Sequence, residues 1–244
     1  MTLAILSDIH ANLEALQACI ERLSPVADRY LCLGDVVGYG PNPNECCEVI
    51  QNLHCVAVVG NHDQAAIGQI DPSWFNPLAA AAVRWTQEHL SESSKRWLLG
   101  LSEVVMEDAF EAAHGALDYP ATGYITDAWS STPTFDLMKR DLCFVGHTHV
   151  AAVYAQAKGH QMVGVQQISS GGSVELKDGF RYILNPGAVG QPRDGIPRAS
   201  CAAYNTEARV VTIMRVDYPV QITQRKMRDA GLPELLWRRL AVGR

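Results

Sequence analysis

The feature that most constrains the fold is a pattern that occurs five times along the chain: a short apolar run ends, and a residue able to bind a metal follows within one or two positions. In chain order these residues are Asp8 with His10, Asp35, Asn61 with His62, His114, and His147 with His149. In open α/β sheets, ligands bind outside the carboxyl ends of the strands. Neighbouring strands would therefore bring these side chains to one common edge.

A glycine stands beside the polar group in four of the five runs, at Gly34, Gly60, Gly115 and Gly146. Because glycine has no Cβ, it lets the backbone turn sharply away from the end of a strand. Asp-x-His and Gly-Asp are each common by chance, and a single histidine beside a strand is more often a structural hydrogen-bonding group. It is the combination of all five runs, in order, that indicates a functional site.

Apolar spacing over the first 150 residues predicts strands that alternate with helices. The expected strands are 3–6, 30–33, 55–59, 110–113 and 142–145, and the expected helices are 13–23, 45–52, 77–90, 94–101 and 134–140. After residue 149, short apolar runs predict consecutive strands at 150–156, 161–168, 180–184, 200–204 and 210–216, with a helical pattern over 227–242. Residues 1–244 are therefore predicted to form a single α/β domain with two sheets packed together.

Composition narrows the classes of partner. Hydrophobic residues make up 48% of the chain, and the net charge of −6 disfavours binding to duplex nucleic acid or to an acidic membrane surface. The longest apolar run, Leu78 to Val83, is far shorter than the roughly 18 residues of a membrane span. Seven cysteines without a Cys-x-x-Cys pair predict reduced thiols in the core. Since the N-terminal residues lack a signal-peptide pattern, we expect a cytoplasmic protein with no membrane partner.

The motifs resemble those of the calcineurin-like metallophosphoesterase superfamily. The matching segments are Asp8-x-His10, Gly34-Asp35, Gly60-Asn61-His62-Asp63, His114-Gly115 and Gly146-His147-Thr148-His149. A later segment, Asn185 to Arg193, is similar to the signature of the small prokaryotic phosphodiesterase branch. The resemblance implies a sandwich of two mixed β-sheets flanked by α-helices, which agrees with the predicted order of strands and helices.

The resemblance also implies a site for two divalent metal ions. One ion would be held by Asp8, His10, Asp35 and His149, and the other by Asp35, Asn61, His114 and His147. Asp35 would serve both ions, since a carboxylate has two oxygens to share. Mixed Asp, His and Asn ligands suit transition metals better than magnesium, so manganese is favoured, with iron, zinc and nickel as alternatives.

For the reaction, the resemblance implies in-line attack on phosphorus by a hydroxide that bridges the two ions, with Asp35 and His62 as catalytic residues. His62 would be the general acid for the leaving group. In the related protein phosphatases, Gly-Asp is followed by an Asp-Arg-Gly segment whose Asp orients the catalytic histidine. This chain has Val36 to Gly40 at that place, which argues against a phosphoprotein phosphatase and leaves the partner of His62 open.

Four residues are candidates for binding the substrate: Asn12, Asn61, His62 and Arg193. Asn12 either contacts a phosphate or caps the helix expected from residue 13. Arg193 follows a loop rich in Gly and Pro, and either reaches the phosphate or is solvated. Three aromatic residues follow His114 in an irregular segment and either line a pocket or pack locally: Tyr119, Tyr124 and Trp129.

The leading hypothesis is a metal-dependent phosphoesterase that hydrolyses phosphodiester bonds in a small phosphoester substrate. A phosphomonoesterase acting on nucleotides or small metabolites would use the same metals. A non-catalytic binding module on the same fold is the alternative from another class, although relatives of that kind have lost ligands and every expected position is filled here. The natural substrate stays open because variable loops decide it, and the oligomeric state stays open as well.

Overall fold

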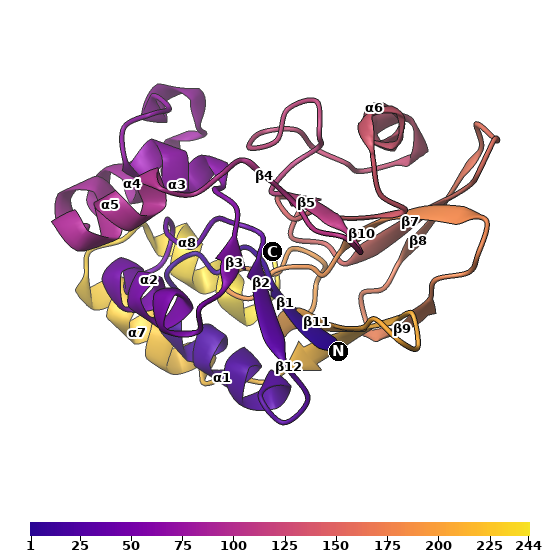
Figure 1. Ribbon diagram of the computed structural model, residues 1–244. Helices are drawn as coiled ribbons and strands as arrows, with labels where there is room; N and C mark the ends of the chain where they lie inside the picture. The colour runs from indigo at the N-terminus through magenta and orange to yellow at the C-terminus, as the bar shows by residue number, and fades with distance from the viewer.

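The computed structural model describes all 244 residues as two six-stranded mixed sheets with eight α-helices around them (Figure 1). The strand order of the first sheet is β3 (Val56–Ala57), β2 (Arg29–Cys32), β1 (Thr2–Leu6), β11 (Ala199–Asn205), β12 (Val210–Val216) and β9 (Gly172–Glu175). That of the second is β4 (Val104–Met106), β5 (Glu111–Ala113), β6 (Leu142–Phe144), β10 (Phe180–Asn185), β7 (Ala152–Ala157) and β8 (Val163–Gln167). The predicted pair of mixed sheets flanked by helices is confirmed.

Each sheet contains three neighbouring parallel strands. In the first sheet β1 pairs with β2 and β2 with β3, and in the second β5 pairs with β6 and β6 with β10. Leu6 of β1 is in register with Cys32 of β2, so these two strands end at the same level. The loops that follow them therefore leave the sheet at one edge.

The core follows from the alternation of side chains along the strands. Leu3 and Ile5 of β1 point between the sheets, where they pack in one cluster with Phe144 of β6. Ala4 and Leu6 point the other way, toward the helices. The neighbouring residues of one strand thus serve two separate apolar clusters, one between the sheets and one beneath the helices.

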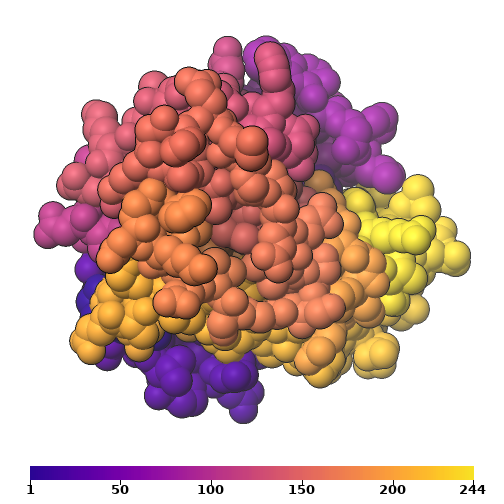
Figure 2. Space-filling model, turned by 90° about the vertical axis from the view of Figure 1, so that its right-hand side faces the viewer, coloured from indigo at the N-terminus to yellow at the C-terminus, as the bar shows by residue number.

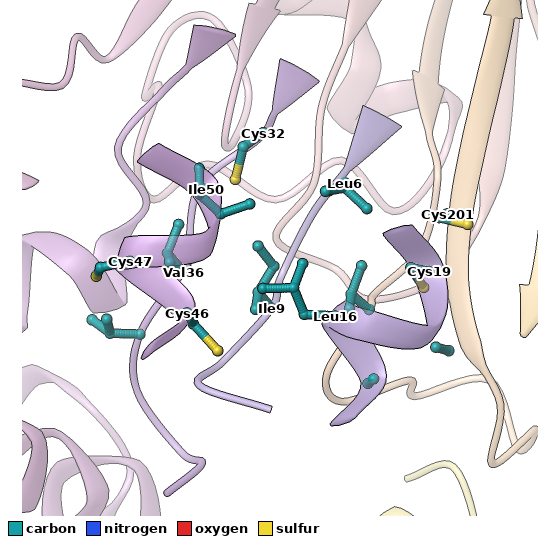
Figure 3. Close-up of a cluster of buried hydrophobic side chains, with 14 of the residues drawn as sticks. Leu6, Ile9, Leu16, Cys19, Cys32, Val36, Cys46, Cys47, Ile50 and Cys201 are labelled. Atoms are coloured by element: carbon teal, nitrogen blue, oxygen red, sulfur yellow. The ribbon is translucent and has the colours of Figure 1, made fainter. Parts of the chain in front are cut away.

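Helices α1 (Leu13–Leu23) and α2 (Pro43–Asn52) pack on the outer face of the first sheet. Figure 3 shows this helix-side cluster, where Leu16 and Cys19 of α1 lie near Leu6 of β1 and Cys201 of β11. Burial of each leucine stabilises the fold by roughly 1.5–3 kcal/mol. This packing lies directly behind the loops that carry the polar residues.

Six of the seven cysteines are buried and all seven are free thiols. Burial raises the pKa of the Cys32 and Cys46 thiols well above the ordinary range, so both are neutral. A neutral buried thiol packs like a small apolar side chain. The prediction that most cysteines are core residues is confirmed.

The remaining helices are α3 (Asn61–Ala66), α4 (Pro77–His89), α5 (Glu92–Leu99), α6 (Ala128–Leu137), α7 (Val220–Asp229) and α8 (Glu234–Arg238), with 3₁₀ turns at Pro72–Trp74 and Arg239–Ala241. Helix α6 packs on β7, β8 and β10, which places it on the outer face of the second sheet. Figure 2 shows the side of the molecule that lies on the right in Figure 1, where the orange segments that include β7 to β9 cover much of the surface. No helix combines the length and the hydrophobicity that crossing a membrane requires.

Several local predictions differ from the structure. The helical pattern expected over 227–242 is divided between α7, which begins at Val220, and α8, and neither α3 nor β9 was predicted. The helix expected at 134–140 is α6, which begins at Ala128 because the Asp127 carboxylate accepts a hydrogen bond from the Ser130 backbone at 2.8 Å. Strand β4 was not predicted, since its apolar run, Val104 to Met106, is only three residues long and lies at a mostly exposed edge of the sheet. Short edge strands are fixed by their partner, here β5, rather than by their own sequence.

Candidate metal centre

The polar residues that follow the strand ends meet in one buried place. Asp8, His10, Asp35 and His149 bring ligand atoms within 4.8 Å of one another, and so do Asp35, His114 and His147. We call these the first and the second cluster. The first draws on loops after β1, β2 and β6, and the second on loops after β2, β5 and β6. Both sheets therefore contribute to each cluster, whereas the sequence pattern predicted neighbouring strands of a single sheet.

In the first cluster, the ring nitrogens and carboxylate oxygens face each other at short distances. His149 Nε2 lies 3.2 Å from Asp8 Oδ1, and His10 Nε2 lies 3.1 Å from His149 Nε2. The other oxygen of Asp8 accepts a hydrogen bond from the Ser7 hydroxyl at 2.6 Å. Asp8 is thus held by its neighbours with one oxygen turned toward the histidines.

The second cluster is built around His114. Its Nε2 lies 3.1 Å from His147 Nδ1 and 3.3 Å from Asp35 Oδ2. Asn61, at the first position of α3, is buried, and its Oδ1 has no hydrogen-bond partner. It lines the same cavity as Asp35 and His147, so its free oxygen is available as a further ligand.

Asp35 joins the two clusters through a single oxygen. Its Oδ1 accepts a hydrogen bond from the His62 backbone at 2.8 Å. Its Oδ2 lies 3.6 Å from His10 Nε2 and 3.3 Å from His114 Nε2, and it has no hydrogen-bond partner. The Oδ2 atom thus faces histidines of both clusters, which is compatible with Asp35 serving two ions.

Backbone carbonyls orient three of the four histidines. The Nδ1 atoms of His10, His114 and His149 each face a carbonyl, at 3.2, 2.7 and 2.6 Å respectively. An N–H at Nδ1 leaves the lone pair on Nε2, which is the nitrogen turned into the clusters. His147 is the exception, because its Nδ1 faces His114 and its Nε2 has no partner.

Burial and charge set the protonation states. Burial lowers the pKa of His10 well below its ordinary value, and it is also the main reason that the pKa of His147 falls to about 3. Burial alone would raise the pKa of Asp35, but the charges of His114 and His62 hold it well below its ordinary range. Neutral imidazoles and ionised carboxylates are the forms that bind metals.

These features fit a divalent cation. With Nδ1 donating to a carbonyl, the Nε2 atoms of His10 and His149 point lone pairs at each other across 3.1 Å. Such lone pairs repel unless a cation lies between them. The unpartnered buried oxygens of Asp35 and Asn61 need a partner as well, since an unsatisfied buried polar atom costs roughly 1–3 kcal/mol.

Backbone strain is concentrated at the same residues. Five of them have left-handed φ angles between 49° and 68°: Asp8, His10, Asp35, His147 and His149. Each such residue costs on the order of 1–3 kcal/mol, which the apolar clusters behind the loops must offset. The glycines act in two ways. Gly34 itself has a φ of +86°, whereas at Gly60 a Cβ would collide with the Asp35 carboxylate.

A cavity of about 380 Å³ opens beside the clusters, and Asp35, Asn61, His62, His147 and His149 are among the residues that line it. The His62 ring packs against Tyr39 and Phe75, with ring centroids 4.5 and 4.9 Å away. No hydrogen-bond partner reaches His62 Nδ1. The ring is therefore held by aromatic packing.

Asp63 does not orient His62, although the two are adjacent in sequence. The Asp63 carboxylate accepts hydrogen bonds from the backbone of Val37 and Gly60, at 3.0 and 3.1 Å. Burial and the charge of Asp35 raise the pKa of Asp63 to about 7. Its role is to fasten the start of α3 to the loop after β2.

The two uncertain candidates for substrate binding lie in different places. Arg193 lines the cavity. The Asn12 amide caps α1 by accepting from the Ala15 backbone at 3.2 Å, and it donates to the Gly190 carbonyl at 2.9 Å. Asn12 is not among the residues that line the cavity, so its contacts support the helix-cap alternative.

Several cavity residues were missed from the sequence. Tyr39, Trp74, Phe75 and Arg239 line the cavity but follow no ligand-type motif. Of the three aromatic residues after His114, only Tyr124 lines it, with its ring 3.8 Å from that of His147. Of these residues, only Tyr39 could have been singled out from the sequence, because it stands in the segment that replaces Asp-Arg-Gly.

Comparisons with known proteins agree with this geometry. The family model of the calcineurin-like phosphoesterase superfamily domain matches residues 1–209. An uncharacterized protein of Methanocaldococcus jannaschii is 35% identical, over 99% of this chain and 98% of its own length. The crystal structure of a metallophosphoesterase from Sphaerobacter thermophilus has a TM-score of 0.89 and 40% identity, covering 100% of both chains.

A hypothetical protein from Pyrococcus horikoshii OT3 shares the fold, with a TM-score of 0.81 at 20% identity over 100% of this chain and 98% of its own. The family match spans every residue of both clusters. The motifs of this chain and its buried Asp and His side chains indicate the metal-dependent chemistry of that family. The chain therefore belongs to the calcineurin-like phosphoesterase superfamily and is a metal-dependent phosphoesterase.

Proposed function

We propose that the protein hydrolyses phosphodiesters with two divalent transition-metal ions, of which manganese is favoured. The first ion would be held by Asp8, His10, Asp35 and His149, and the second by Asp35, Asn61, His114 and His147. When bound, two such ions supply an acidified water and neutralise charge on the phosphoryl oxygens. The observation that carries the proposal is which side chains line the cavity.

Two groups of side chains that are not metal ligands line the cavity beside the clusters. Ile70, Trp74 and Phe75 line it from the segment after α3, and Phe75 contacts the His62 ring. Thr122 and Tyr124 line it from the segment after β5, and the Tyr124 ring lies tilted against that of His147. A phosphodiester carries two organic groups and a monoester only one. Two such groups of side chains beside one phosphoryl position therefore support a diester substrate.

His62 is the proposed general acid. Burial lowers its pKa to about 4, so in the metal-free, substrate-free protein the ring is neutral at pH 7. An anionic substrate beside it raises that pKa, because negative charge favours the protonated ring. The packing of Tyr39 and Phe75 against the ring fixes its plane toward the cavity while leaving Nδ1 without a partner.

The test compares two chromogenic substrates after reconstitution with manganese, iron, zinc or nickel. We expect kcat/KM for bis-p-nitrophenyl phosphate to exceed that for p-nitrophenyl phosphate by at least about tenfold, and chelation to abolish both activities until metal is restored. His160→Ala, at an exposed histidine far from the ligand set, is the matched control for His114→Ala. A preference for the monoester would favour the phosphomonoesterase hypothesis, and inactivity with two ions bound would favour the binding module.

We also propose that residues 1–244 act as one domain in the cytoplasm. The apolar cluster shared by both sheets supports a single unit. The seven free thiols support a reducing compartment. Limited proteolysis that releases a stable fragment carrying only one sheet would contradict the single domain.

A further inference from the structure

Two arginines, Arg193 and Arg239, line the cavity, and neither forms an ion pair with an Asp or Glu side chain. Other arginines nearby in sequence are paired: Arg198 with Asp217, Arg215 with Asp194, and Arg238 with Glu234. A guanidinium offers five N–H donors in a fork that matches phosphoryl oxygens. Two guanidinium groups in one cavity, neither held by an acidic side chain, therefore indicate a binding site for anionic groups.

Arg193 is positioned close to the first cluster. Its backbone N–H donates to the His149 carbonyl at 3.3 Å. Its Nη2 donates to Gln191 Oε1 at 3.1 Å and to the Tyr39 hydroxyl at 3.4 Å, with the guanidinium 5.8 Å from the centre of the Tyr39 ring. The Nε atom is buried and has no partner. Arg193 is thus held in place with donors still free.

Arg239 comes from the C-terminal segment, beyond the residues that the family model matches. The segment is anchored because Leu236 and Leu240 are buried in one apolar cluster with Tyr39 and Ala79. Arg239 Nε donates to the Arg244 carbonyl, and its two Nη atoms have no hydrogen-bond partner. The packing of this segment on Tyr39 and α4 is what brings a second guanidinium to the cavity.

The two charges act on different neighbours. The charge of Arg193 affects His149, His62 and Tyr124, whereas the charges that affect Arg239 are those of Arg193 and Tyr39. Burial and the charge of Arg193 both lower the pKa of Arg239. Like charges that face one cavity repel, and an anion between or beside them removes that cost.

The geometry points to a second phosphoryl subsite at Arg239, so that the preferred substrates carry a further phosphoryl group besides the one that is hydrolysed, with Arg193 between the two. This inference rests on the proposed function. The second group is attached either directly, as in a diphosphate, or on another carbon of the same molecule, as in a bisphosphate. Both present the oxygens that a guanidinium binds.

The experiment measures competitive inhibition of bis-p-nitrophenyl phosphate hydrolysis at saturating manganese. The inhibitors are adenosine 5′-monophosphate, adenosine 5′-diphosphate and adenosine 3′,5′-bisphosphate. In the wild type we expect at least one of the doubly phosphorylated nucleosides to bind about tenfold more tightly than the monophosphate. Which of the two does so identifies the attachment of the second group. Arg239→Met should remove this preference, and Arg238→Met, whose side chain is exposed and paired with Glu234, should keep it.

Calorimetry of the same inhibitors with metal-free protein gives a second readout that does not depend on turnover, and thermal melting checks that both variants are folded. An equal preference in wild type and Arg239→Met would overturn the inference, as would a wild type without any preference. If Arg239→Met weakens all three inhibitors equally, Arg239 binds the scissile phosphoryl group and the second subsite is wrong. Wild-type protein that binds metal but hydrolyses no diester would instead refute the proposed function.

Discussion

The two clusters share Asp35 but differ in how firmly their other members are held. In the first, Asp8 adds a second carboxylate, and the rings of His10 and His149 are both fixed by backbone carbonyls. In the second, the only carboxylate is the shared one, and His147 has no carbonyl partner. Two carboxylates neutralise a divalent ion better than one, and fixed rings lose less freedom on binding.

The difference shows that one centre combines a rigid site with a more adaptable one. Asn61 and His147 line the cavity, as do Asp35 and His149, so ligands of both clusters face it. We therefore expect two ions to bind with unequal affinity, the tighter at the first cluster. This comparison is tested by three kinds of replacement: at a residue of both clusters, at a residue of neither, and at a residue of one.

The largest effect is expected for Asp35→Asn, because Asp35 Oδ2 faces histidines of both clusters. Loss of several kcal/mol of charge stabilisation would lower kcat/KM by about a thousandfold or more. Calorimetry and elemental analysis should find both ions weakened. Asp8→Asn is the matched variant, which should weaken the first ion alone. Two tight ions in Asp35→Asn would refute the shared role.

His62→Ala should leave both ions in place, because the His62 ring belongs to neither cluster. Hydrolysis of alkyl or nucleoside esters should fall by about 10²–10⁴-fold, and that of nitrophenyl esters by much less, since nitrophenolate leaves without a proton. The measurement is kcat/KM across leaving groups of graded pKa. If the slope of that plot is the same as in the wild type, His62 is not the general acid.

Single histidine replacements should separate the clusters. His149→Ala should weaken the tighter ion and His147→Ala the weaker one, each by about 10–100-fold, because each ring belongs to one cluster only. Two-site manganese titration by calorimetry distinguishes them. If His147→Ala weakens the tighter ion instead, the assignment of affinities to clusters is reversed.

The smallest effect concerns pH. Burial opposes protonation of His114, but the charge of Asp35 prevails and raises its pKa to about 9, whereas burial lowers the pKa of His10 and His149. The second ion must therefore displace a proton below pH 9, and its affinity should rise up to about tenfold from pH 7 to 8, while that of the first ion changes little. Titrations in buffers of different ionisation enthalpy measure the proton released. Release by the first ion only would contradict this.

The sequence by itself determined the fold class and the membership of the two clusters. Asp8, Asp35 and His114 each follow a short apolar run. A buried strand needs consecutive apolar residues, and a ligand must stand where that strand ends, so both the strand and the ligand can be recognised from a local pattern. Strand β4 escaped prediction because its apolar run is only three residues long and its place at the sheet edge depends on pairing with β5.

Tertiary structure decided how these residues are used. That Asp35 offers a single oxygen to both clusters follows from the hydrogen bond with the His62 backbone, 27 residues away in sequence. Asn12 became a helix cap because Gly190 and Thr223 surround its amide. Arg239 reaches the cavity only because Leu236 and Leu240 pack beside Tyr39, about 200 residues earlier in the chain. Contacts over such separations depend on how whole elements pack, and no local pattern of residue types encodes them.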